Sequence, residues 1–361
     1  MKILVTGGAG FIGSHVVDAF IQAGHQVVVV DNLSTGRREN LHPKAILYSL
    51  DIRSPDLADV FAKERPEVVD HHAAQADVRR SVAEPLFDAE VNIIGSLNLL
   101  QSAVKYGVKK FIYISSGGAI YGEPEYLPCD EGHPVRPLSP YGVTKHTIEH
   151  YLYLYHQNFG LRYLVFRYAN VYGPRQDPMG EAGVVAIFGG QMLRGAKVAI
   201  NGDGEQERDF LYVSDCARAN VIGLERGEGA YNLGTGIGTT INEIFARIKA
   251  ITRRTHLMDQ DLKVSHGPWH FGKTMTELYR GHQLFRLTPI QGLIMQALIK
   301  QAGQFVSGET LTVKIWGEHH AATADDLRVH IHHIRKKLDD SPASPRYICN
   351  KPGQGYMLVC E

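Results

Sequence analysis

The stretch Met1–His15 reads MKILVTGGAGFIGSH, and it decides the fold of the first part of the chain. An apolar run typical of a buried strand leads into Gly7, Gly10 and Gly13, which are spaced three apart and open a helix-like segment. Glycine permits the tight turn, lets the backbone approach a pyrophosphate, and lets the helix pack closely on the strand. The N–H groups at the helix N-terminus would face the phosphates. The stretch therefore predicts a dinucleotide-binding strand–loop–helix unit.

The next apolar run, QVVVVD at residues 26–31, ends in Asp31. A carboxylate at the end of the second strand can accept hydrogen bonds from a ribose 2′-hydroxyl. The same carboxylate would repel a 2′-phosphate, so the pattern favours NAD over NADP. Arg37 and Arg38 follow closely and are the feature that would favour the phosphorylated cofactor.

A second group of polar residues consists of Ser116, Tyr141 and Lys145. In SPYGVTK, the spacing Tyr-x-x-x-Lys puts the phenol and the ammonium on one face of a helix, one turn apart. A phenol is a poor base at neutral pH, but a neighbouring ammonium stabilises the phenolate. Tyr141 is thus a candidate base for a hydroxyl group, and Ser116 would hydrogen-bond the same reacting oxygen. A solvated helix face is the alternative for this spacing.

The composition of the chain limits the classes of function that it can have. The 361 residues carry 38 Lys+Arg and 38 Asp+Glu, so no whole-chain field favours nucleic acid, and any basic surface must be local. The four cysteines have no paired spacing and are expected to be reduced. The sequence has no run long enough to span a membrane, and its start is a core strand rather than a signal peptide. These features predict a cytoplasmic protein without membrane partners.

The chain changes character near residue 254. Before it, strand-like and helix-like segments alternate, which predicts a doubly wound parallel sheet with helices on both faces. Residues 255–267 are polar, aperiodic and broken by Gly267 and Pro268, so we interpret them as a linker. Residues 268–361 follow a different pattern of short strands, helices and a closing hairpin. We therefore predict domains at 1–254 and 268–361.

Residues 1 to about 252 resemble extended short-chain dehydrogenase/reductases, and among them the UDP-glucose 4-epimerases. The matching segments are TGGAGFIGSH, DNLSTG, LDIR, HHAAQADVRRSV, VNIIGSLNLL, SSGGAIYGE, SPYGVTK, RYANVYGPRQDP, EAGVVAIF, GDGEQERDFLYVSD and NLGTG. The resemblance implies a Rossmann-like fold, tightly held NAD, Tyr141 as the base for the sugar 4-hydroxyl, a UDP-sugar substrate and a homodimer through this domain.

The resemblance also assigns individual residues. It implies that NAD is held by Gly7, Gly10, Phe11, Ile12, Gly13, Asp31, Asn32, Asp51, Ile52, Ala73, Ala74, Asn92, Tyr141 and Lys145. For the UDP-sugar it implies Asn170, Val184, Val185, Phe188 and Arg208. Arginine suits the diphosphate because it can grip two oxygens at once.

One departure from the family follows NLGTG. Relatives continue for several tens of residues, with a second phosphate-binding arginine in an Arg-x-Gly-Asp-like segment and residues that cover the sugar. Here the match stops near residues 251–254, and FGKT and YRGHQ are poor substitutes. A lost charged hydrogen bond reduces affinity by roughly tenfold to a hundredfold. We therefore expect intact NAD binding in a domain with a truncated substrate lobe, while turnover stays open.

The last part of the chain has its own local signals. A turn is expected at Arg280–His282, a helix capped by Thr288 with Pro289 in first position, a second helix from Ser307 to Gly317, and a third capped by Thr323. In the third helix, Leu327, Ile331, Ile334 and Leu338 form one apolar stripe. RYICNKPGQGYMLV is expected to close the domain as a hairpin.

This region resembles the OmpR/PhoB-type winged-helix effector domain, a small α+β fold, through LTP, IWG, VHIHHIRKKL, PRYI and GQGY. The resemblance makes the third helix a reader of the DNA major groove and the hairpin a wing. Pro352 stands where many relatives have a wing arginine, so we expect a weaker minor-groove contact. The implied contacts to duplex DNA are Arg328, His330, His332, His333, Arg335, Lys336, Asn350 and Lys351.

Two other interpretations of the third helix stay open. It is a solvated basic face, or its histidines bind a metal, although they lack the i, i+4 spacing of a helical metal site; we predict no metal. For the whole chain, three hypotheses remain. The chain is a working epimerase with a DNA-binding tail, a regulator whose damaged enzyme domain senses NAD or a nucleotide sugar, or a fusion without coupled function.

Overall fold

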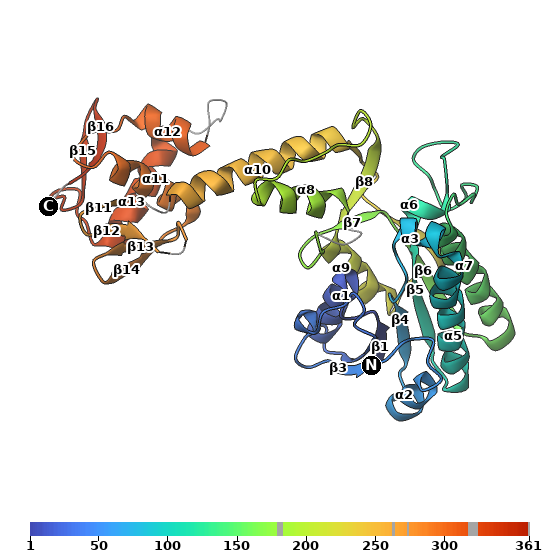
Figure 1. Cartoon of the computed structure of the whole chain (residues 1–361). Helices are drawn as coiled ribbons and strands as arrows, with labels where there is room; N and C mark the ends of the chain where they lie inside the picture. The colour runs from blue at the N-terminus through green and yellow to red at the C-terminus, as the bar shows by residue number, and fades with distance from the viewer. Residues whose placement is uncertain (179–182, 262–263, 273, 317–323, 360–361) are drawn as a thin grey trace. The chain divides into compact units, whose positions relative to one another are not determined.

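The computed structural model describes residues 1–178, 183–261, 264–272, 274–316 and 324–359, without the side chains of 253–263, 316 and 324. The chain divides into two compact units, Met1–Lys249 and Ala250–Glu361, each with its own apolar core (Figure 1). The predicted boundary at residue 254 falls within a helix and five residues beyond the division that the structure shows.

A seven-stranded parallel sheet forms the centre of the N-terminal unit, with strand order β3-β2-β1-β4-β5-β6-β9. The strand order reverses direction between β1 and β4, which is where open α/β sheets bind nucleotides. The strands are β1 Lys2–Thr6, β2 Gln26–Asp31, β3 Ile46–Ser49, β4 Val68–His71, β5 Lys110–Ser116, β6 Arg162–Tyr168 and β9 Gly229–Leu233.

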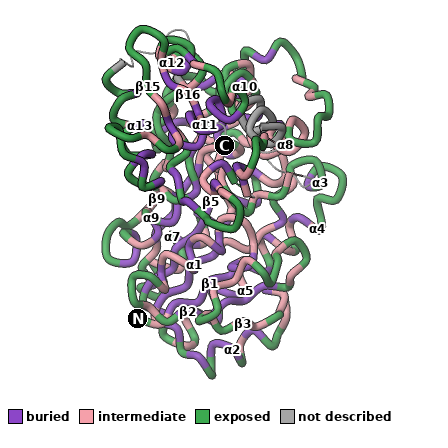
Figure 2. Tube along the Cα trace, turned by 90° about the vertical axis from the view of Figure 1, so that its left-hand side faces the viewer, coloured by how far each residue is buried: buried purple, intermediate pink, exposed green. Residues whose placement is uncertain are grey.

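Helices cover both faces of this sheet, as the alternating sequence pattern predicts. Leu4 packs into a core with α2, α5 and α7, whereas Ile3 and Val5 pack into a second core with α1 and α9. Buried residues accordingly run along the central strands in Figure 2. The bounds are α1 Phe11–Gln22, α2 Leu57–Glu64, α3 Val78–Ala83, α4 Pro85–Ala89, π-helix η2 Glu90–Ile94, α5 Gly95–Lys105, α6 Gly117–Ile120, α7 Pro140–Phe159 and α9 Val213–Gly223, with the 3-10 turn η1 at Arg38–Asn40.

A small three-stranded sheet, in the order β10-β8-β7, lies beyond the carboxyl end of β6. Its strands are β7 Asn170–Tyr172, β8 Glu207–Tyr212 and β10 Gly238–Thr240. The helix α8, Val184–Leu193, belongs to the same region. This part of the fold supplies the residues that the sequence assigns to the UDP-sugar.

In its described residues, the C-terminal unit contains the end of α10, a four-stranded antiparallel sheet, three further helices and a hairpin. Thr288 caps α11 with a full capping box. Its side chain accepts the Gln291 N–H, and the Gln291 side chain accepts the Thr288 N–H. The predicted turn is present, with Gly281 at φ 59° between β13 and β14. The elements are β11 Ser265–His266, β12 Trp269–Phe271, β13 Glu277–Arg280, β14 Gln283–Arg286, α11 Pro289–Lys300, α12 Gly308–Trp316, α13 Ala324–Leu338, β15 Ile348–Lys351 and β16 Gly355–Leu358.

The segment predicted as a linker is largely helical. Helix α10, Ile241–Asp261, continues through residues 255–261, and β11 already begins at Ser265. The segment has no glycine or proline before Gly267, so nothing in it interrupts a helix once begun. Gly317 and Thr323, predicted to end α12 and cap α13, lie outside the described residues.

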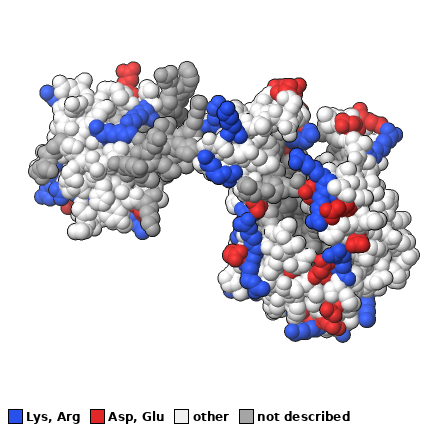
Figure 3. Space-filling view, in the orientation of Figure 1, with Lys and Arg blue, Asp and Glu red and all other residues white. Residues whose placement is uncertain are grey.

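Within the described residues, no helix combines the length and apolar character needed to cross a bilayer. Cys129, Cys216 and Cys349 are free thiols. On the face of the N-terminal unit seen in Figure 3, positive and negative side chains are interspersed.

Candidate functional site

The glycine loop between β1 and α1 is shaped by its backbone contacts. Gly7 adopts φ 66°, and its N–H donates to the Val30 carbonyl at 2.9 Å. A Cβ on Gly13 would lie 2.2 Å from the Gly7 carbonyl oxygen, so only glycine fits where α1 packs on the loop. Phe11 and Ile12 begin α1 and are half-buried. The loop is therefore a tight cradle at the carboxyl end of β1.

Asp31 fastens this loop to the end of β2. Its carboxylate accepts the Ala9 N–H at 2.9 Å and the Leu33 N–H at 2.8 Å. The side chain is 7% exposed, so the two hydrogen bonds fix it close to the loop. Asp31 thus shapes the cradle as well as supplying the predicted acceptor for a ribose.

A second carboxylate, Asp51, lies beside Asn32. Asn32 donates to Asp51 at 3.0 Å, and Arg53 grips the same carboxylate with two hydrogen bonds of 2.9 Å. These bonds from Arg53 hold the pKa of Asp51 well below its usual range. Ile52 is buried where Gly95 allows α5 to approach closely.

At the end of β4, the Ala73 N–H donates to Thr6 Oγ1 at 3.1 Å, and Ala73 lies against Gly7. Ala74 follows directly and is half-buried. Asn92 is buried on the π-helix η2 and bridges the backbone of Gln75 through both ends of its amide. These predicted cofactor residues thus form the strand end that faces the glycine loop.

The structure brings Ser116, Tyr141 and Lys145 together. Ser116 ends β5, and the other two lie one turn apart near the start of α7. The Ser116 side chain lies close enough to Tyr141 to lower the pKa of its phenol. The Lys145 ammonium lies 5.9 Å from the centroid of the Tyr141 ring and donates to the Ile114 carbonyl at 2.9 Å. The solvated-face alternative does not hold for Lys145, which is 4% exposed.

Burial governs the electrostatics of this group. Burial raises the pKa of Tyr141 to about 12, partly offset by the hydrogen bond with Ser116. Burial also lowers the pKa of Lys145 to about 8, while the charges of Asp88 and Glu149 raise it. The expected depression of the Tyr141 pKa is therefore not a property of the protein groups alone, because desolvation disfavours the phenolate.

Asp88 and Glu149 are functional candidates that the sequence did not reveal. Asp88 is fully buried and accepts hydrogen bonds from Gln75, Asn92 and Thr144 at 2.8 to 3.1 Å. Asp88 is four residues before Asn92, so the shared helical face was a signal in the sequence. Its partner Thr144 lies 56 residues away and only tertiary structure brings it near.

Four of the five predicted substrate residues, Asn170, Val184, Val185 and Arg208, line one cavity of about 170 Å³. Gly183, which precedes the first turn of α8, lines it as well. Phe188 does not line this cavity: it is 4% exposed and packs edge-on against Phe245, 6.0 Å between ring centroids. Phe188 lies one turn beyond Val184 on the same face of α8, but its ring is covered by Phe245 of α10.

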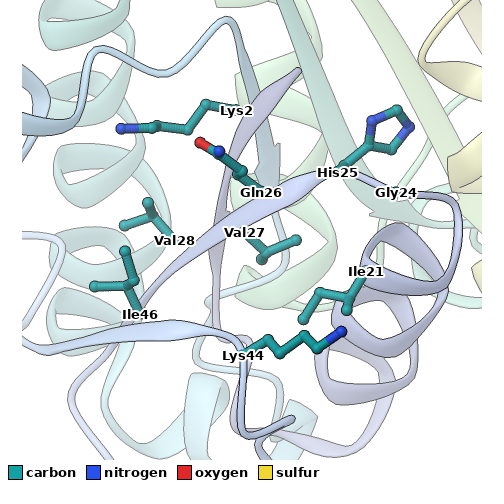
Figure 4. A pocket seen from close by; sticks show the side chains of 9 residues that line it. All are labelled: Lys2, Ile21, Gly24, His25, Gln26, Val27, Val28, Lys44 and Ile46. Atoms are coloured by element: carbon teal, nitrogen blue, oxygen red, sulfur yellow. The ribbon is translucent and has the colours of Figure 1, made fainter.

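A larger cavity of about 420 Å³ lies at the other end of the strands (Figure 4). Lys2 begins β1 and Gln26 begins β2, whereas the glycine loop follows the carboxyl end of β1. In Figure 4, the side chains of Lys2 and Lys44 extend in opposite directions, so the charges do not converge. This cavity is separate from the site.

In the C-terminal unit, one face of α13 presents exposed polar side chains. Val329 is also exposed, whereas His330 is half-buried, and Asn350 and Lys351 are exposed at the tip of the β15–β16 hairpin. Pro352 lies in the turn of that hairpin. The exposed basic and histidine side chains of α13 are Arg328, His332, His333, Lys336 and Lys337.

Arg335 departs from the expectation. It is 8% exposed, and its guanidinium donates to the Ile348 carbonyl of β15 at 2.8 Å. The prediction that it faces a DNA groove is therefore wrong, because Arg335 follows Ile334 and lies at the margin of the buried stripe. The sequence also missed Asp340, whose buried carboxylate accepts the backbone N–H groups of Arg346, Tyr347 and Ile348.

No group of three or more histidine, cysteine or acidic side chains suited to a metal ion lies among the described residues. The geometry thus defines a dinucleotide-binding α/β unit with a Ser–Tyr–Lys group, and a separate winged-helix unit.

Comparisons with known proteins agree with this description. The family model "NAD dependent epimerase/dehydratase family" matches residues 3–234, and "Transcriptional regulatory protein, C terminal" matches residues 282–358. The UDP-glucose 4-epimerase of Mycolicibacterium smegmatis is 46% identical over 255 residues, covering 69% of this chain and 82% of that protein.

Two solved structures are also similar. A UDP-glucose 4-epimerase of Thermotoga maritima, with UDP-glucose, is 55% identical at a TM-score of 0.69, over 70% of this chain and 83% of that one. The Thermus thermophilus enzyme, in complex with NAD, is 47% identical at a TM-score of 0.68, over 70% of this chain and 84% of that one. The chain belongs to the NAD-dependent epimerase/dehydratase family, and its C-terminal unit is an OmpR/PhoB-type transcriptional regulatory domain.

Proposed function

We propose that the N-terminal unit is an NAD-dependent UDP-hexose 4-epimerase and that the C-terminal unit binds duplex DNA. The observation that carries the enzymatic part is the meeting of Ser116, Tyr141 and Lys145 at the carboxyl edge of the sheet. The glycine cradle follows β1 at the same edge, and Ser116 pairs in register with Tyr168, two residues before Asn170 of the substrate cavity. Cofactor, base and sugar would thus meet at one edge.

The residues present fit NAD. The close contact of Gly13 with Gly7 gives the loop the tight glycine turn that pyrophosphate-binding loops use, and Asp31 is held at the end of β2. Bound NAD would supply the hydride acceptor. Tyr141 would take the proton of the sugar 4-hydroxyl, with Ser116 holding the same oxygen and Lys145 stabilising the phenolate.

The pKa of Tyr141 determines how strongly its phenolate must be stabilised before it can act as a base. Lowering it from about 12 to near 7 requires about 7 kcal/mol of differential stabilisation of the phenolate. Lys145 can supply part of this as an ammonium, and with a pKa of about 8 it is mainly protonated at neutral pH. The positive charge of the oxidised nicotinamide would supply more.

The cavity at Arg208 suits a diphosphate. Arg208 offers a guanidinium, and the first-turn N–H groups of α8, after Gly183, lie on the same cavity. Val184 and Val185 would line the nucleotide end. We also propose a homodimer through the N-terminal unit, supported by exposed apolar side chains on α3, α4 and η2, among them Val82, Leu86 and Ile94.

For the C-terminal unit, the exposed face of α13 supports contact with a major groove, and Asn350 and Lys351 support contact by the wing. Arg328, His332, His333 and Lys336 are the proposed contacts on α13, with His330 at the margin of the face.

The test begins with mass spectrometry and absorbance of the purified chain, which should reveal bound NAD. Interconversion of UDP-glucose and UDP-galactose is then measured for the parent and for Tyr141→Phe. We expect turnover in the parent and none in the variant, with NAD still bound. Unchanged turnover in Tyr141→Phe would refute the assigned base, and no turnover in an NAD-loaded parent would refute the epimerase proposal.

A further inference from the structure

Helix α7 carries a pair of histidines that the proposed reaction does not use. His146 and His150 are four residues apart, and their Nε2 atoms lie 3.1 Å from each other. The two rings form a T-shaped pair, with an angle of 71° between their planes and 4.5 Å between their centroids. His150 is exposed and His146 has 24% of its side chain exposed, so solvent reaches the pair.

We propose that His146 and His150 form a binding site for a divalent transition-metal ion such as Zn²⁺ or Cu²⁺. Two nitrogens bound to a tetrahedral ion at about 2.0 to 2.1 Å lie about 3.3 Å apart. The observed 3.1 Å requires only a slight opening of the pair. Imidazole nitrogen suits zinc and copper, whereas magnesium and calcium prefer oxygen.

The surroundings of His146 favour this role. Its Nδ1 lies 3.2 Å from Glu149 Oε2, and a carboxylate there accepts the Nδ1 proton and leaves the Nε2 lone pair available. Glu149 is itself fixed, because Arg167 donates to both of its oxygens and Ser115 to one. A carboxylate–histidine–metal arrangement of this kind orients the ring before the ion arrives.

The pair supplies two protein ligands, and water would complete the coordination. The described ranges contain no group of three or more ligating side chains, so they offer no third protein ligand for the ion. The competing explanation is a plain hydrogen bond between two neutral imidazoles, one donating and one accepting. A pair joined only by such a hydrogen bond would bind no ion, so titration with a metal ion distinguishes the two explanations.

The site would lie directly beside the proposed catalytic group, since His146 follows Lys145 on α7. It rests on the geometry of His146, His150 and Glu149 on α7 and of the residues that hold Glu149, and it stands whether or not the chain is an epimerase. Its test therefore uses metal binding in the absence of sugar.

The experiment titrates the untagged full chain with Zn²⁺, and separately with Cu²⁺ and Mg²⁺, by isothermal calorimetry. The variants are His146→Gln and His150→Gln. The matched control is the double variant His332→Gln/His333→Gln, which removes two exposed histidines from α13. Circular dichroism establishes that each variant is folded.

We expect Zn²⁺ and Cu²⁺ to bind and Mg²⁺ not to bind at this pair. Loss of either ligand should weaken the site by roughly tenfold or more, since even loss of an outer partner weakens metal sites by about 10- to 100-fold. The α13 control should keep this binding event. Folded His146→Gln and His150→Gln chains that bind zinc with unchanged affinity and stoichiometry, or a parent that binds none, would overturn the proposal.

Discussion

Replacing Arg335 by alanine should destabilise the C-terminal unit rather than change its sequence preference for DNA. The guanidinium donates to the Ile348 carbonyl at 2.8 Å, and the side chain is 8% exposed. A hydrogen bond from a charged donor contributes about 1.5 to 3 kcal/mol, and its loss leaves a buried carbonyl without its partner. Release of a partly desolvated charge offsets some of the lost packing. We expect a net loss of about 2 to 4 kcal/mol.

The assay can follow this unit within the full chain. Both tryptophans, Trp269 and Trp316, belong to the C-terminal unit, and Trp269 is buried in its core. Tryptophan fluorescence during urea unfolding therefore reports this unit alone. With an m-value of about 2 kcal/mol per M, the midpoint should fall by roughly 1 to 2 M urea.

Lys336→Ala is the matched control, because Lys336 is the next residue and is exposed. Its unfolding free energy should change by less than about 0.5 kcal/mol. An Arg335→Ala chain with an unchanged tryptophan transition but altered DNA sequence preference would refute the assignment of Arg335 to the interior. It would show that the guanidinium reaches a base instead.

Three further predictions concern the sites themselves. Lys145→Met should abolish turnover but raise the unfolding free energy of the N-terminal unit by about 1 to 3 kcal/mol at neutral pH, because burial lowers the Lys145 pKa from 10.5 to about 8. Between pH 8 and pH 10.5, Lys145 binds more protons in the unfolded state than in the folded state, so the unfolding free energy of the parent increases as the pH rises. The difference, measured by circular dichroism, should therefore fade toward pH 10.5; a pH-independent difference would contradict the burial argument. Asp31→Ala should weaken NAD binding by roughly tenfold or more and reduce the preference over NADP in calorimetry, whereas equal loss for both cofactors would assign Asp31 to loop shape alone. Lys336→Ala should weaken all DNA sequences alike and lower the salt slope by about 1 in fluorescence anisotropy; a loss confined to one sequence would count against a phosphate contact.

The parts of the fold that the sequence predicts are those with local causes. The glycine spacing at Gly7–Gly13 and the Thr288–Gln291 capping box act within a few residues, so their patterns are visible in the chain itself. The alternation of strand-like with helix-like segments predicts the parallel sheet in the same way. The helix at residues 255–261 was harder to predict, because the segment is polar and aperiodic. It nevertheless contains no glycine or proline that would break α10 before Asp261.

The orientation of a single helical side chain is harder to predict. Arg335 borders the apolar stripe of α13, and whether it turns inward depends on the Ile348 carbonyl, 13 residues away. Asp340 is likewise explained only by the strand it anchors. A basic residue inside a basic helix gives no sign of such a partner, so resemblance to DNA-binding relatives assigned it to the wrong side.

Buried carboxylates connect these observations at the proposed catalytic group. Burial alone drives Tyr141 and Lys145 toward their neutral forms, raising one pKa and lowering the other. The charges of Asp88 and Glu149 raise the pKa of Lys145 and so favour the ammonium that a phenolate needs. Hydrogen bonds from Thr144 and Arg167 hold these carboxylates in place. The Tyr-x-x-x-Lys spacing thus identifies the reacting groups, while their protonation depends on two acids brought in by the fold.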